Sequence, residues 1–112
     1  MSEIPLIVTA YELYRSLLDV TSRVDRRFRF GLAAKLEEQT LELLELLVMA
    51  KHAPKALKSG YLLRATGRLE VVRLCLRLLL EMKLANETNV FKLQEKAAEA
   101  GRMLGGWLRS LA

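Results

Sequence analysis

The segment Leu69–Lys83, LEVVRLCLRLLLEMK, restricts more than any other what this chain can fold into. Apolar residues fill most of its positions, so a helix formed by it is apolar on almost every side. A helix with an apolar arc of ~100° packs on one core, whereas one that is apolar all round must be buried on several sides. The segment therefore predicts a helical protein in which this helix contacts more than its own bundle.

The same periodicity continues along the chain and predicts four helices. Apolar residues recur at steps of three and four over residues of about 5–24, 30–51, 61–84 and 87–110. We expect connections at residues 23–29, which are strongly basic, at 51–60 and at 85–89. Pro54 and Gly60 punctuate the second connection, and Asn86 in the third is a candidate N-cap. Short connections favour an antiparallel up-and-down four-helix bundle, an all-α single domain over residues 1–112.

The second and third predicted helices have more apolar surface than one bundle needs. In the second, one stripe consists of Leu32, Leu36, Leu43 and Leu47, and a further one consists of Leu41, Leu44 and Val48. Together they cover an arc of roughly 200°. Because monomers rarely expose an apolar patch of that size, we expect a homo-oligomer in which the surplus faces another copy. The alternative is an error of a residue or two in the assigned helix phase.

Charge points to an anionic partner. The chain has 18 Lys and Arg against 13 Asp and Glu, a net charge of +5. Residues 1–59 have nine basic and eight acidic groups, a net of +1, and residues 60–112 have nine and five, a net of +4. A basic half is typical of nucleic-acid binding, and a solvated surface that happens to be basic is the alternative.

The sequence shows neither a catalytic set nor a targeting segment. His52 has no second ligand nearby, and Cys75 lies among leucines, where a thiol is usually an inert apolar group. The glutamates of the second helix are interpreted as its solvated face; they are Glu37, Glu38, Glu42 and Glu45. We therefore expect no enzyme, no cofactor and no metal. Without a signal peptide, a membrane span of ~18 apolar residues or a second cysteine, we expect a cytoplasmic protein.

Arg73 and Arg77 are the leading candidates for nucleic-acid contact. They lie one helical turn apart among leucines, and a guanidinium must find water, a carboxylate or a phosphate. Ion pairs with Glu70 or Glu81 would satisfy them within the chain. Alternatively, an oligomer would repeat the two arginines around a water-filled surface and so concentrate positive charge.

Two further basic sets are candidates for phosphate contact. The first comprises Arg23, Arg26, Arg27 and Arg29, and the second, at the opposite end of the bundle, comprises Lys51, Lys55 and Lys58. Simple solvation of loops is the alternative for both. The aromatic residues are not interleaved with basic ones in a pattern that indicates base stacking. We therefore expect electrostatic, salt-sensitive and weakly sequence-selective binding of RNA or DNA.

The last predicted helix contains Gly101, Gly105 and Gly106. Each glycine costs a helix interior roughly 0.5–1 kcal/mol relative to alanine. Gly101 and Gly105 are one turn apart, and a row of small residues lets two helix backbones approach closely. We predict a tight crossing of this helix on a neighbour, closed by Trp107 and Leu108.

Three segments resemble one family of small helical proteins. GRMLGGWLRS at Gly101–Ser110 resembles the closing signature of accessory variability determinant (Avd) proteins of diversity-generating retroelements and of proteins encoded in rRNA intervening sequences. Residues 69–83, with the pair Arg73 and Arg77, resemble the third helix of that family, and residues 29–50 resemble its second. The resemblance covers most of residues 11–110, and Ala33 stands where the family often has glycine.

The resemblance implies both an assembly and a function. It implies a four-helix bundle assembled as a ring of five. It also implies a non-catalytic accessory protein that binds a reverse transcriptase and its template RNA and supports mutagenic cDNA synthesis. The alternative within the family is a structural or protein-interaction scaffold of the rRNA intervening-sequence type without a nucleic-acid role.

Overall fold

The computed structural model describes the backbone of residues 3–112 and the side chains of residues 5–112. The described chain is helical, which confirms the predicted all-α class. Its elements, in chain order, are α1 (Glu3–Thr21), α2 (Arg26–Phe28), the π-helix η1 (Arg29–Ala33), α3 (Ala34–His52), α4 (Lys55–Glu81) and α5 (Glu87–Ser110). Because α2, η1 and α3 follow one another without a break, residues 3–112 form four long helical segments.

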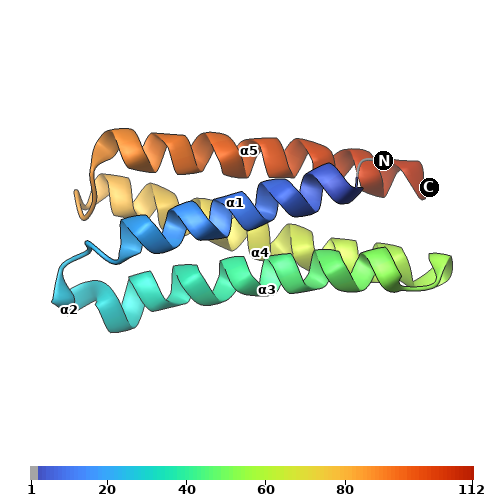
Figure 1. Ribbon diagram of the computed structural model, residues 1–112, viewed down its shortest axis with the longest axis horizontal. Helices are drawn as coiled ribbons and strands as arrows, with labels where there is room; N and C mark the ends of the chain where they lie inside the picture. Colours follow the sequence, from blue (N-terminus) through green and yellow to red (C-terminus); the bar gives the residue numbers. More distant parts are fainter. Residues whose placement is uncertain (1–2) are drawn as a thin grey trace.

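The four long helices lie side by side along the 43 Å axis of a molecule that measures 23 and 19 Å in the other directions (Figure 1). α1 packs against α3 and α5, and α4 packs against the same two helices. Each helix thus contacts the next one along the chain, and α5 returns to α1. This arrangement is that of an up-and-down bundle.

One leucine-rich core joins the four helices. Its fully buried large side chains include Leu13 and Leu17 of α1, Leu36, Leu43 and Leu47 of α3, Leu62, Leu76 and Leu79 of α4, and Leu93 and Leu104 of α5. Buried hydroxyls have hydrogen-bond partners within the chain; for example, Thr40 Oγ1 donates to the Leu36 carbonyl at 2.7 Å. Among the residues described, no buried side-chain nitrogen or oxygen lacks a hydrogen-bond partner.

The basic connection after the first helix is shorter than predicted. α1 ends at Thr21, and the next helical segment begins at Arg26, because the Asp25 side chain accepts a hydrogen bond from the Arg27 amide at 2.8 Å. An Asp at this position is a favourable N-cap. The structure thus corrects the predicted ranges 5–24 and 30–51, and most of the arginine-rich segment is helical rather than a loop.

The expected loop at residues 51–60 is also mostly helical. Only Ala53 and Pro54 separate α3 from α4, and Gly60 lies within α4. The Lys58 ammonium donates to the carbonyls of Ala50 and Lys51 at 2.8 and 2.9 Å, which satisfies groups left open at the end of α3. Pro54 marks the start of the helix, and the cost of one helical glycine is small enough for the helix to continue through Gly60.

The α4–α5 connection is a tight helix end. Lys83 has a left-handed backbone with φ of 56°, and the Leu84 amide donates to the Leu79 carbonyl at 2.9 Å. This geometry ends α4 at Glu81 instead of near residue 84. The Asn86 side chain then accepts from the Asn89 amide at 3.0 Å and caps α5.

None of the helices in residues 3–112 combines the length and apolar composition needed to cross a membrane.

Candidate nucleic-acid interface

Arg73 and Arg77 lie on the exposed side of α4, in its C-terminal half. Arg77 Nε pairs with Glu81 Oε2 at 2.9 Å, and the two side chains remain 69% and 56% exposed. Such an exposed pair contributes little stability and leaves guanidinium N–H groups free for another partner. Arg73 forms no ion pair with any residue whose side chain is described. One of the two arginines thus has the internal partner considered from the sequence, and the other does not.

Arg73 lies where two grooves between α4 and α5 meet. One groove of about 390 Å³ is lined by Arg73, Glu70 and Leu69 from α4 and by Gly101, Arg102 and Gly105 from α5, among others. A second groove, also of about 390 Å³, is lined by Glu70, Arg73, Leu74, Arg77 and Gln94. Together they hold three arginines and one glutamate. Arg102 was missed by the sequence reasoning, and its position directly after Gly101 places it beside the same groove.

Gly101 and Gly105 of α5 border this groove, and none of the three α5 glycines lies at a tight crossing within the described chain. A Cβ added at Gly101 would lie 3.5 Å from Leu69 Cδ2, an ordinary contact distance. At Gly105 and Gly106 an added Cβ would meet only the guanidinium of Arg109, at 3.3 and 3.9 Å. Trp107 is buried on the opposite side of the helix and Leu108 is half-buried. Within the described residues, no other helix of the same chain lies close to Gly105. A close approach of α5 to another helix at this residue therefore stays a prediction, and it would involve a second copy of the chain.

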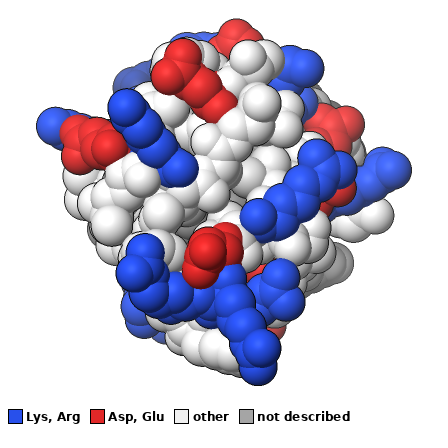
Figure 2. Space-filling model, turned by 90° about the vertical axis from the view of Figure 1, so that its left-hand side faces the viewer, with Lys and Arg blue, Asp and Glu red and all other residues white. Residues whose placement is uncertain are grey.

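The arginine set around α2 gathers at one end of the bundle, in the lower part of the end view (Figure 2). Arg23 pairs with Asp19 at 3.4 Å, and both side chains are largely exposed. Arg29 Nη2 donates to the Ser22 carbonyl at 3.0 Å, which positions the guanidinium without neutralising it. The Arg27 guanidinium lies 4.9 Å from the centre of the Phe28 ring, and Arg26 is exposed.

The lysine set lies at the opposite end, where α3 meets α4 (Figure 1). Lys51 and Lys55 are exposed. Lys58 is half-buried, and its ammonium is already bonded to the end of α3 as described above. Only the first two are thus free to contact a phosphate without breaking a structural bond.

The glutamates of α3 differ from one another. Glu37 Oε2 accepts a 2.6 Å hydrogen bond from the Thr21 hydroxyl, and Glu42 Oε2 pairs with Arg68 Nε at 3.0 Å. These two carboxylates therefore join α3 to α1 and α4, and the prediction of a merely solvated face was wrong for them. Glu38 and Glu45 are exposed.

The remaining candidates for chemistry are isolated. His52 is exposed at the end of α3. Cys75 is half-buried, and its burial raises the pKa of its thiol, with Lys35 opposing the effect. A raised pKa lowers the thiolate fraction at neutral pH and so lowers nucleophilicity. Within the described residues, no three His, Cys, Asp or Glu side chains are grouped to hold a metal ion.

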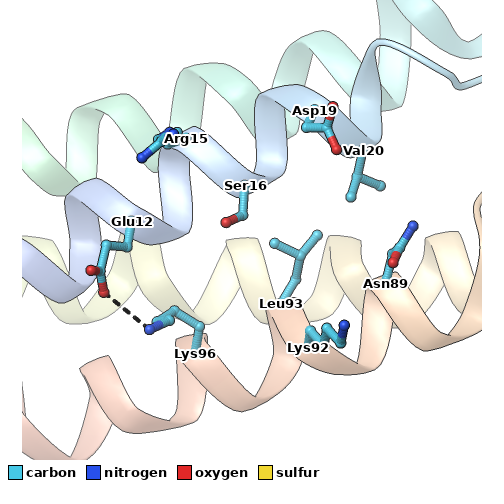
Figure 3. A pocket seen from close by; sticks show the side chains of 9 residues that line it. All are labelled: Glu12, Arg15, Ser16, Asp19, Val20, Asn89, Lys92, Leu93 and Lys96. Atoms are coloured by element: carbon cyan, nitrogen blue, oxygen red, sulfur yellow. Dashed lines mark hydrogen bonds and ion pairs between the residues drawn. The ribbon is translucent and has the colours of Figure 1, made fainter.

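A larger groove of about 720 Å³ lies between α1 and α5 (Figure 3). Glu12 and Lys96 face each other across it and pair at 3.1 Å. Its other polar lining residues include Arg15, Asp19 and Lys92, so both signs of charge alternate along it. This mixture indicates no ligand class, whereas the α4–α5 grooves have an excess of arginine.

The fold and the candidate site together define the class of protein, a small basic helical bundle with arginines along one groove and at one end. Within that class, the family model described as bAvd-like matches residues 6–111, and the chain belongs to this family. The match confirms the resemblance that the three sequence segments indicated. No curated protein matches the chain.

Proposed function

We propose that this protein is a non-catalytic accessory protein of a diversity-generating retroelement, which binds the template RNA and the reverse transcriptase and supports mutagenic cDNA synthesis. The observation on which the proposal chiefly depends is the bAvd-like family match over residues 6–111. The arginine-lined α4–α5 grooves supply a surface of suitable charge. Three arginines lie along these grooves, namely Arg73, Arg77 and Arg102. Because they would contact phosphates, the same surface would also bind DNA.

The proposal includes assembly into a homo-oligomer, for which the family resemblance implies a ring of five. The exposed side of α4 supports it, because apolar residues follow one another there at helical spacing: Leu63, Val71, Leu74, Leu78 and Met82. Leu41 and Val48 of α3 are exposed as well. They lie in the two helices whose surplus apolar surface the sequence assigned to a second copy. An oligomer would repeat the arginine groove and strengthen its field.

The same apolar side of α4 favours a second candidate function. A protein that only assembles with itself and with other proteins needs this surface and no nucleic acid. Its basic surface would then meet an acidic protein. The two functions differ in whether RNA binds at the arginine groove.

The test is RNA binding by Arg73→Ala/Arg77→Ala, measured by fluorescence anisotropy with a structured RNA over a series of salt concentrations. Arg15→Ala/Arg64→Ala is the matched control, because it removes two exposed arginines that lie outside the α4–α5 grooves. We expect weaker binding and a shallower dependence on salt only for the first variant, since each lost phosphate contact reduces the slope of log K against log[salt] by ~0.7–0.9.

Light scattering checks that both variants assemble like the unmodified chain. Equal loss of binding in both variants would mean that net charge alone attracts RNA. If the unmodified chain leaves RNA unbound at low salt, the scaffold function stands. Co-purification with the reverse transcriptase encoded nearby tests the second partner, and its absence would remove that part of the proposal.

A further inference from the structure

Phe30 is the most exposed large apolar side chain of the described protein, at 83% of its full accessibility. It lies in η1, at the end of the bundle where α2 turns into α3 (Figure 1). From Asp19 to Thr40 it is the one large apolar residue in the exposed class. Protein-docking surfaces present contiguous apolar patches, whereas the exposed residues within four positions of Phe30 are three arginines, one glycine and one alanine.

Its neighbours are arginines. Arg26 precedes Phe30 by four residues and Arg27 by three, which places both about one helical turn away, and Arg29 is adjacent in sequence. Arg26 is exposed and forms no ion pair with a described residue. Arg29 bonds only to a neutral carbonyl, so its charge stays available. The acid nearest in sequence, Asp25, accepts from the Arg27 amide and caps α2.

The two phenylalanines of this segment have different environments. Phe28 is half-buried, packs on the core and lies beneath the Arg27 guanidinium. Its packing anchors the segment, and one face of its ring is covered. Phe30 has neither kind of cover, and it lies in a π-helical turn, a local geometry often found at functional sites. An open ring beside free guanidinium groups matches a nucleotide, which has one stacking face and one phosphate per residue.

We infer that Phe30, Arg26 and Arg29 form a binding site for an unpaired segment of nucleic acid. A base stacks on the Phe30 ring, and the neighbouring phosphates contact the two arginines. The site rests on the proposed function and deepens it, because it distinguishes single strands from duplexes. It differs from the expectation drawn from the aromatic residues as a whole, because basic and aromatic residues do interleave in RRFRF at Arg26–Phe30.

The experiment compares Phe30→Leu with the unmodified chain on two probes, a labelled single-stranded oligouridine and a blunt RNA duplex of equal length. Stacking on an aromatic ring is worth ~1–3 kcal/mol per base, so we expect about tenfold weaker binding of the single strand. Duplex affinity should stay within about twofold, because duplex bases are already stacked. Phe30→Trp, which keeps an aromatic ring, should bind the single strand about as tightly as the unmodified chain does.

A second measurement reports the stack itself. A 2-aminopurine placed in the single strand should lose fluorescence on binding to the unmodified chain and keep it in the complex with Phe30→Leu. Circular dichroism and light scattering show whether this variant remains folded and assembled; since Phe30 is 83% exposed, we expect both to be unchanged.

The outcomes separate this inference from the proposed function. Unchanged single-strand binding by Phe30→Leu overturns the stacking site, while loss of binding in Arg73→Ala/Arg77→Ala leaves the proposed function intact. A changed mass in light scattering would show that Phe30 contacts a second copy, and it would also overturn the site. If neither probe binds the unmodified chain at low salt, the proposed function fails together with the site.

Discussion

Lys83 is the only non-glycine residue with positive φ in the described chain, at 56°. It ends α4, with its amide donating to the Leu80 carbonyl at 3.1 Å and the Leu84 amide donating to Leu79 at 2.9 Å. Glycine is the usual residue at this position, because a Cβ disfavours the left-handed region. Lys83→Gly should therefore raise the free energy of unfolding by about 1 kcal/mol, measured by urea denaturation. Lys83→Ala, which removes the same charge and keeps a Cβ, should not stabilise; equal gains in both variants would assign the effect to charge.

For individual residues, the sequence predicted burial better than it predicted polar contacts. Spacing alone identified Leu32, Leu36, Leu43 and Leu47 as one face; the first is half-buried and the other three are buried. It did not predict that Thr21 bonds to Glu37 or that Arg68 pairs with Glu42. Burial follows from the period of one helix, whereas a side-chain bond depends on the relative register of two helices, which no local pattern encodes.

Helix ends were the weakest part of the prediction at the scale of elements. Pro54 and Gly60 both indicate a break, yet only Pro54 marks one. The helix continues through Gly60 because Tyr61 and Leu62 bury apolar surface directly after it, which outweighs the ~1 kcal/mol cost of one glycine. The arginine groove could not be predicted in full either. Arg102 lies beside Arg73 only because α5 packs against α4, and the sequence does not show which faces of the two helices meet.

Replacing Gly60 and Gly105 by alanine should have different effects on assembly. A Cβ at Gly60 meets nothing within 4 Å, and one at Gly105 meets only the flexible end of Arg109. Each glycine-to-alanine change should thus stabilise the helix of a single chain by about 0.5–1 kcal/mol. If α5 approaches a second copy at Gly105, Gly105→Ala should nevertheless reduce the assembled fraction in light scattering, while Gly60→Ala should leave it unchanged. Full assembly of Gly105→Ala would refute the close approach.

At the scale of the whole molecule, the exposed apolar stripe of α4 is the feature that favours assembly with a second copy. The core is complete with one stripe from each helix, and α4 retains a second stripe in which Leu74 is 55% and Leu78 40% exposed. Because both side chains lie outside the core, their replacement should spare the fold. Their burial against another copy would supply roughly 1.5–3 kcal/mol for each side chain in each contact.

Leu74→Glu/Leu78→Glu therefore tests the homo-oligomer directly. Two carboxylates placed in an apolar interface would lose their hydration, so we expect the variant to elute and scatter light as a single chain of 12.7 kDa with unchanged helix content. Tyr11→Glu/Phe91→Glu, which places two carboxylates on exposed apolar positions of α1 and α5, should keep the mass of the unmodified assembly. Dissociation in the control alone would move the interface to the α1–α5 side, and an intact assembly in both variants would exclude each of these surfaces.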